Sequence, residues 1–206
     1  MSLAEKAFAE LAQALAKQFA SNWTYVKPSA SSIVSNADCG YLVSSKQVLT
    51  VKASEDQLDY EDSTCEVDED PAPKDDKAIF QFHVTYSRTH KVPMLFFRAT
   101  RIDGSLVDLE SLVLRPTEGE CTVTQQEHPV LGTPFFAIHP CKTSSLMAAV
   151  LSDSASSDSR YLCTWLTIVG QPLAVSLLPP THKWPAKIHK ASKNEATGSS
   201  ERKTFE

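Results

Sequence analysis

Residues 79–87 alternate between apolar and polar side chains, and this pattern constrains the fold more than any other stretch of the chain. Every second position is apolar (Phe80, Phe82, Val84, Tyr86), and the positions between are polar (Gln81, His83, Thr85, Ser87). Successive side chains of a strand point to opposite faces of a sheet, so this period predicts a half-buried strand. Further strand-like runs cover residues 41–51, 94–101 and 134–138, and Asp103-Gly104 marks a tight turn after the run 94–101.

Helical patterns flank these strands. Near the N-terminus, apolar side chains recur at helical spacing, and Ser2 and Glu5 match a capping box; the stripe is Leu3, Ala7 or Phe8, Leu11, Leu15 and Phe19. We interpret the stripe as core-facing, with a partner-binding face as the alternative. Residues 144–151 are also helical in pattern, and so are residues 161–169 after a cap at Asp158, although a strand is the alternative there. This order predicts an α+β domain.

Length and composition predict one domain, residues 1–182 of the 206-residue chain. A polar, lysine-rich tail follows at residues 183–206, and we expect it to be disordered. Residues 55–77 hold eleven of the 25 acidic residues. Like-charge repulsion predicts a flexible acidic loop there, either a solvated connection or a docking strip for a basic partner.

Composition excludes several classes of protein. The formal net charge of -5 gives no support to nucleic-acid binding. No apolar run is long enough for a membrane helix, and Glu5 and Glu10 argue against a mitochondrial transit peptide. The five cysteines are an odd set without a C-x-x-C pair, which is typical of reduced thiols in a cytoplasmic protein.

One of these cysteines is placed as a nucleophile. Cys141 follows an apolar strand and His139-Pro140, and it precedes a predicted helix, whose N-terminus favours a thiolate. Cys163 lies in an apolar element and is predicted to be buried and inert. The remaining cysteines lack an activating context: Cys39, Cys65 and Cys121.

Three chemistries could use Cys141. A zinc site would have to combine it with Cys121, His128 and His139, whose spacing is irregular. A cysteine protease needs a histidine and an orienting group whose proximity the sequence does not show. Acyl-thioester transfer needs mainly position and oxyanion stabilisation, since the thiolate is a good leaving group.

The segment 125–143, Q-Q-E-H-P-V-L-G-T-P-F-F-A-I-H-P-C-K-T, and the later segments Tyr161-Leu162-Cys163-Thr164-Trp165-Leu166 and Val169-Gly170 resemble the autophagy branch of the ubiquitin-conjugating-enzyme superfamily. The resemblance covers most of the chain outside the acidic loop and the tail. It implies a ubiquitin-conjugating-enzyme-like fold: an N-terminal helix, an antiparallel sheet of four or slightly more strands, and helices after the catalytic cysteine.

The resemblance also implies an activity. Cys141 would accept the C-terminal glycine of the ubiquitin-like autophagy-related protein 12 from the activating enzyme, autophagy-related protein 7. It would then pass the glycine to a lysine of autophagy-related protein 5, with no cofactor and no metal. The alternatives are a sibling enzyme of the autophagy-related protein 3 type, which conjugates to phosphatidylethanolamine, a non-catalytic binding module on the same scaffold, and an unrelated thiol hydrolase.

The chain departs from ordinary ubiquitin-conjugating enzymes in one respect. Those carry His-Pro-Asn several residues before the cysteine, whereas here the tripeptide ends in Cys141 itself. We therefore expect oxyanion stabilisation from a backbone N–H after Cys141, supported by Thr143 or Tyr86. His139 is either a base or a structural residue; we favour the structural role because adjacent strand positions point to opposite faces.

Overall fold

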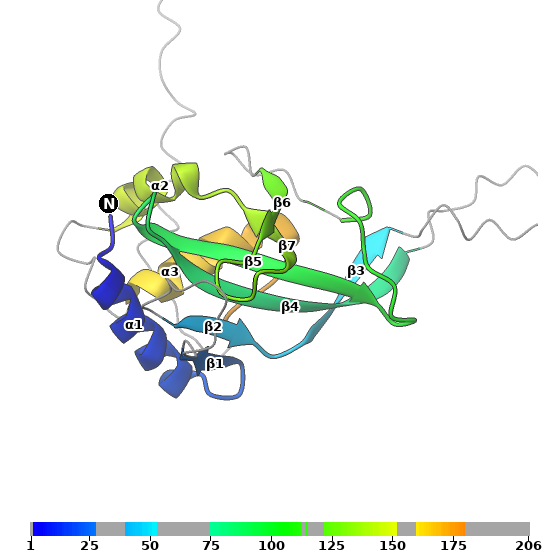
Figure 1. The fold of residues 1–206 in the computed structure, drawn as a ribbon, viewed down its shortest axis with the longest axis horizontal. Coiled ribbons are helices and arrows are strands. Elements are labelled where there is room, and N and C mark those ends of the chain that lie inside the picture. The colour runs from blue at the N-terminus through cyan, green and yellow to red at the C-terminus, as the bar shows by residue number, and fades with distance from the viewer. Residues whose placement is uncertain are drawn as a thin grey trace, which may run out of the picture.

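In the part of the chain that the structure describes, seven antiparallel strands form one sheet, and the helices precede and follow it in the chain (Figure 1). The structure is a computed structural model that describes residues 2–27, 40–52, 75–112, 114, 122–151 and 160–179. Its strands are β1 (Trp23–Val26), β2 (Tyr41–Ser44), β3 (Gln47–Lys52), β4 (Asp75–Ser87), β5 (Val92–Arg101), β6 (Val123–Glu127) and β7 (Pro134–Ile138). Its helices are α1 (Glu5–Gln18), η2 (Pro140–Lys142), α2 (Thr143–Val150), α3 (Arg160–Gly170) and η4 (Gln171–Leu173).

The sheet is built around the long β4–β5 hairpin. The strand order is β1-β2-β4-β5-β7-β6, and β3 pairs with β4 beyond the end of β2. The described sheet has seven strands, where four or slightly more were expected, since β1 and β6 were not predicted and the run 41–51 divides into β2 and β3. The α+β class is confirmed, and so are the N-terminal helix and the helices after Cys141.

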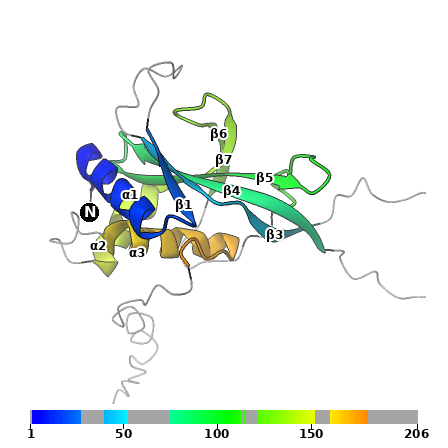
Figure 2. The same ribbon diagram turned by 90° about the horizontal axis from the view of Figure 1, so that it is seen from below.

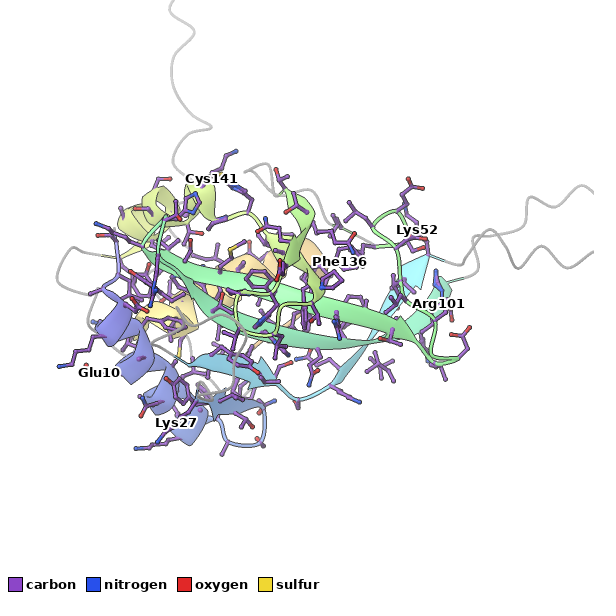
Figure 3. All side chains as sticks on the ribbon, in the orientation of Figure 1. Glu10, Lys27, Lys52, Arg101, Phe136 and Cys141 are labelled. Atoms are coloured by element: carbon purple, nitrogen blue, oxygen red, sulfur yellow. The ribbon has the colours of Figure 1, made fainter. Side chains whose placement is uncertain are left out.

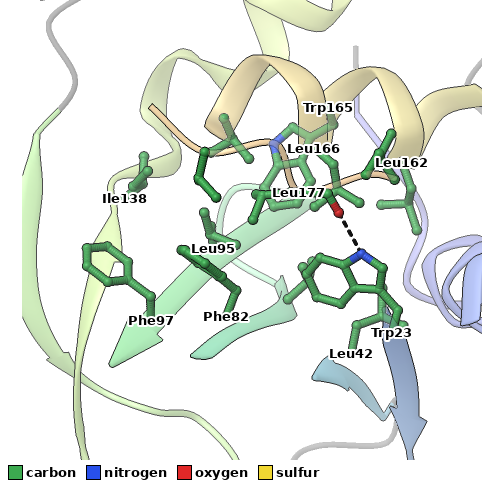
Figure 4. Packing of buried hydrophobic residues seen from close by; sticks show 14 of the residues in the cluster. Trp23, Leu42, Phe82, Leu95, Phe97, Ile138, Leu162, Trp165, Leu166 and Leu177 are labelled. Carbon is green, nitrogen blue, oxygen red and sulfur yellow. Dashed lines mark hydrogen bonds between the residues drawn. The ribbon is translucent and has the colours of Figure 1, made fainter. Parts of the chain in front are cut away.

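The main core lies between one face of the sheet and α3 (Figures 2 and 4). Residues 160–170 are a helix rather than the alternative strand, and Leu162 and Leu166 are fully buried against Phe82 and its neighbours. Trp23 closes one end of this core, where its indole N–H donates to the Leu177 carbonyl at 2.8 Å. The predicted apolar stripe of α1 is buried, which confirms its core-facing interpretation.

The opposite face of the sheet is partly buried as well, contrary to the half-buried strand predicted for residues 79–87. His83 and Thr85 lie on that face and are buried. A second apolar cluster covers this part of the sheet, because β5 and β7 place bulky side chains beside β4; the cluster is Met94, Phe96, Phe135 and Ala137.

Two predicted boundaries are wrong. Helix α1 begins at Glu5 after Ala4, which makes no side-chain capping bond, so Ser2 and Glu5 form no capping box. The predicted loop bound at residue 77 is too late, because residues 75–77 are the start of β4 and pair with β3. Residues 55–74, Asp158 and the tail at 183–206 lie outside the described residues, as does the end of the predicted domain at residue 182.

Candidate active site

Strand β7 delivers Cys141 to the surface. The strand lies between β5 and β6, where Phe136 pairs with Phe97 on one side and with Gln125 on the other. The His139 N–H continues this pairing by donating to the Thr122 carbonyl at 2.9 Å. Pro140 then opens the short helix η2, since its fixed φ suits a first helical position. Cys141 follows on η2, exposed and immediately before α2 (Figure 3).

His139 caps this turn. Its Nδ1 accepts the Cys141 backbone N–H at 3.2 Å, which is the structural role favoured from the sequence. A ring nitrogen that accepts a hydrogen bond carries no proton, so neutral His139 holds its proton on Nε2. In this geometry His139 has no ring nitrogen open to take a proton from a substrate.

Thr143 and Tyr86, the other two predicted supporting residues, lie on different elements and make different hydrogen bonds. Thr143 begins α2 two residues after Cys141, and its backbone N–H donates to the Pro140 carbonyl. Tyr86 belongs to β4, and its hydroxyl donates to the Leu3 carbonyl at 2.6 Å. A phenol has one proton, so Tyr86 has none left for an oxyanion while this bond is held.

The structure adds a histidine that the sequence did not single out. The turn between β4 and β5 places the His90 ring 5.6 Å from the His139 ring, in an edge-to-face arrangement. Ser87 lies within hydrogen-bond distance of the His90 Nδ1, at 3.2 Å. A histidine in a turn between two predicted strands carries no signal of its own. Only the fold brings residue 90 to residue 139.

The second described thiol is buried, as predicted. Cys163 lies on α3, and burial raises the pKa of its thiol to about 11, which disfavours the nucleophilic thiolate. Cys39, Cys65 and Cys121 lie outside the described residues.

A zinc site is not assembled from the part of the chain that the structure describes. There, no three His, Cys, Asp or Glu side chains are grouped so that they could hold a metal ion. His128 in particular lies buried, with its Nδ1 accepting the N–H groups of Val130 and Leu131 and its Nε2 facing His83. No described helix is both long and apolar enough to span a membrane.

Comparison with known proteins identifies the family. Residues 7–178 match the family described as autophagocytosis associated protein, active-site domain. The chain belongs to this family. The exposed Cys141, on a turn held between a strand and a helix, lies within the residues that match this family.

Two curated relatives of this chain share one name. The "Ubiquitin-like-conjugating enzyme ATG10" of Homo sapiens is 39% identical over 124 residues, which are 55% of this chain and 56% of the relative. The Arabidopsis thaliana enzyme of the same name is 30% identical over 123 residues, 52% of this chain and 54% of the relative. The chain thus spans about half the length of the curated relatives that it matches. The solved structure "Crystal structure of Autophagic E2, Atg10" covers 84% of this chain and 98% of its own, with a TM-score of 0.47 and 18% identity.

Proposed function

We propose that this family member is a ubiquitin-like-protein conjugating enzyme of autophagy, with Cys141 as the residue that carries the thioester. The observation that supports this most is the exposed thiol on η2, fixed by the strand before it and the helix after it within an active-site domain. Thioester exchange onto a thiol requires mainly access and position, and this turn supplies both. Helix α2 begins two residues later and fixes the other end of the turn.

The substrates in this proposal are proteins. Cys141 accepts the C-terminal glycine of the ubiquitin-like autophagy-related protein 12 from the activating enzyme, autophagy-related protein 7. The acyl group then passes to a lysine of autophagy-related protein 5, so that an isopeptide bond forms and the Cys141 thiolate leaves. The relatives named ubiquitin-like-conjugating enzyme support this assignment. The unpaired Cys141 and Cys163 fit a reducing compartment, and we place the reaction in the cytoplasm.

The decisive experiment replaces Cys141 by serine. Incubated with the activating enzyme, ATP and the ubiquitin-like protein, the parent should form an adduct that a reducing agent cleaves. Cys141→Ser should form an oxygen ester that survives the reducing agent, and Cys163→Ala should behave as the parent. An adduct that maps to another residue, or no adduct in the parent, overturns the proposal.

The same incubation separates the sibling enzyme from this one. Each ubiquitin-like protein of autophagy is supplied alone, and the one charged onto Cys141 identifies the branch. Transfer to phosphatidylethanolamine vesicles would support the sibling reading, and charging by neither protein would support a non-catalytic module.

Thr143 is the remaining side chain of the oxyanion proposal. It stands two residues from Cys141, whereas the Tyr86 hydroxyl is held by Leu3. We expect Thr143→Ala to slow single-turnover discharge more than Tyr86→Phe does, because the Tyr86 hydroxyl bonds the Leu3 carbonyl and acts only indirectly. If both variants discharge at the parent rate, neither side chain stabilises the oxyanion.

A further inference from the structure

The turn that joins β4 to β5 contacts the segment that carries Cys141, through His90 and His139. Residues 88–91 form this turn, and the His90 ring lies edge-to-face against the His139 ring, with centroids 5.6 Å apart and planes at 77°. His139 in turn holds the Cys141 backbone N–H. The His90 imidazole, from a distant part of the chain, thus contacts the histidine that caps the turn carrying Cys141.

Contacts with the N-terminal segment fix this turn in place. The Leu3 N–H donates to the Lys91 carbonyl at 2.8 Å, and Arg88 forms an ion pair with Glu5 at 2.9 Å. The Lys91 N–H closes the turn on the Ser87 carbonyl at 2.7 Å. His90 is exposed, but its backbone is held from both sides. A positioned side chain of this kind reacts as if at high local concentration.

Ser87 defines which nitrogen of His90 is open. The Ser87 Oγ accepts the His90 backbone N–H at 3.4 Å and lies 3.2 Å from the His90 Nδ1. In the tautomer whose Nδ1–H donates to this hydroxyl oxygen, the lone pair on Nε2 is available. A proton arriving at Nε2 then gives an imidazolium that keeps its bond to Ser87.

We propose that His90 is the base that takes the proton from the attacking lysine during transfer of the acyl group from Cys141; this inference rests on the proposed function. His139 is unsuited to the task, because its Nδ1 holds the Cys141 N–H. Amines with a reference pKa of about 10.4 attack only when neutral, and the attack leaves a cationic nitrogen that has to lose a proton.

The step balances as follows. The neutral amine of the lysine forms a C–N bond to the thioester carbonyl, whose electrons move onto oxygen. His90 Nε2 takes one proton from the cationic nitrogen of this tetrahedral intermediate. The carbonyl re-forms, the C–S bond breaks, and its electron pair leaves on the Cys141 sulfur as thiolate. The His90 imidazolium then releases its proton to water.

The groups facing His90 define the background for a pH test. Its own turn carries Arg88, which pairs with Glu5 of α1, and Lys91. The opposite segment contributes His139, which holds the Cys141 backbone N–H. His90→Gln keeps a side chain able to bond Ser87 but unable to take a proton, and Thr89→Gln is the matched control on the same exposed turn.

The experiment measures charging and discharge separately in the full chain. Charging of Cys141 with the ubiquitin-like protein should be the same in the parent, His90→Gln and Thr89→Gln. On adding free lysine, or the acceptor protein, His90→Gln should discharge about 100-fold more slowly, as general-base removal typically does. Hydroxylamine is a much weaker base than lysine, so the cationic nitrogen formed by its attack loses its proton to water without a protein base, and it should discharge both glutamine variants at nearly the parent rate.

Each outcome decides one question. If the charged His90→Gln adduct discharges to lysine within about threefold of the parent at every pH, well short of a general-base effect, His90 is not the base. If hydroxylamine discharge falls as far as lysine discharge, the substitution has damaged the site and the base assignment is overturned. If the parent itself is not charged, the proposed function fails, and this failure is visible before any discharge is measured.

Discussion

The buried pair formed by His83 and His128 predicts a sharp loss of stability in mild acid. The two rings lie 3.2 Å apart, nitrogen to nitrogen, and both side chains are buried. Burial lowers the pKa of His83 to about 4, helped by the positive charge of Arg98. Burial likewise lowers the pKa of His128 to about 3, with smaller contributions from His83 and Arg98.

The hydrogen bonds explain why neither ring tolerates a second proton. His128 Nδ1 accepts two backbone N–H groups, so its proton is on Nε2 and is donated to His83 Nδ1. His83 then carries its own proton on Nε2, which has no hydrogen-bond partner among the described residues. Protonating either ring would place N–H against N–H in an aromatic environment formed by Tyr41, Phe96 and Phe135.

The magnitude follows from proton linkage. Both histidines bind protons in the unfolded chain below about pH 6.5 but not in the folded protein, so the free energy of unfolding falls as the pH falls. Each histidine contributes a slope of about 1.4 kcal/mol per pH unit, which gives about 2 kcal/mol each, and about 4 kcal/mol together, by pH 5. This loss depends only on the folded pKa values lying below 5. It is a large part of the 5–15 kcal/mol that stabilises a typical domain.

Urea unfolding measured from pH 7 to pH 5 tests this prediction. His83→Gln removes one titrating group and keeps an acceptor for the His128 Nε2–H, so its loss of stability over this range should be about half that of the parent. The carboxyl groups of Asp103 and Asp108, whose pKa values are lowered by hydrogen bonds from Ser105 and Ser111, titrate in both proteins and cancel in the comparison. Thr89→Gln, which changes no titrating group on the exposed turn 88–91, is the control and should keep the parent's slope. A parent that loses less than about 1 kcal/mol, or a His83→Gln variant with the full slope, would refute the reasoning.

Three further substitutions and modifications test the fold and the site. In Gly170→Ala the new Cβ would lie 2.6 Å from a backbone oxygen, so thermal denaturation should show a net loss of about 1–2 kcal/mol despite the better helix former. Trp23→Phe leaves the buried Leu177 carbonyl without its donor and should cost about 2–3 kcal/mol in urea unfolding, whereas an unchanged midpoint would contradict the packing. Iodoacetamide should alkylate Cys141 in the native protein and leave Cys163 unmodified until the chain unfolds, as peptide mass mapping can establish; equal labelling of both would contradict the burial of Cys163.

Local sequence patterns predicted where strands lie, but not what covers them. Residues 134–138 form β7 with the predicted bounds. These bounds could be predicted locally, because a proline and a cysteine-bearing turn follow the strand directly in the sequence. The alternation in residues 79–87 gave the correct strand but the wrong environment for one face. His83 is buried by side chains such as Phe135 and His128, which lie more than forty residues away in the sequence. No periodicity within the strand could reveal that cover.

The capping box failed for a similar reason. Ser2 and Glu5 have the right spacing, but the Glu5 carboxylate receives two hydrogen-bonding groups of Arg88 from the β4–β5 turn. A charged pair of this kind outweighs a local bond to a helix N-terminus, because a guanidinium offers several donors in one plane. Residue types and spacing were correct, and the tertiary partner decided the outcome.

The same tertiary contacts explain why the site could be located but not completed from the sequence. Lys91 has a φ of 54°, a left-handed conformation that costs a residue other than glycine about 1 kcal/mol or more, and it persists only where the surroundings impose it. Here Leu3 imposes it: its N–H holds the Lys91 carbonyl, while its own carbonyl is held by Tyr86. Tyr86 is thus an anchor for the turn that carries His90, rather than a group that faces Cys141. Segments around residues 3, 90 and 140 meet only because the β4–β5 hairpin reaches from α1 to the cysteine turn, and that meeting is a property of the folded sheet.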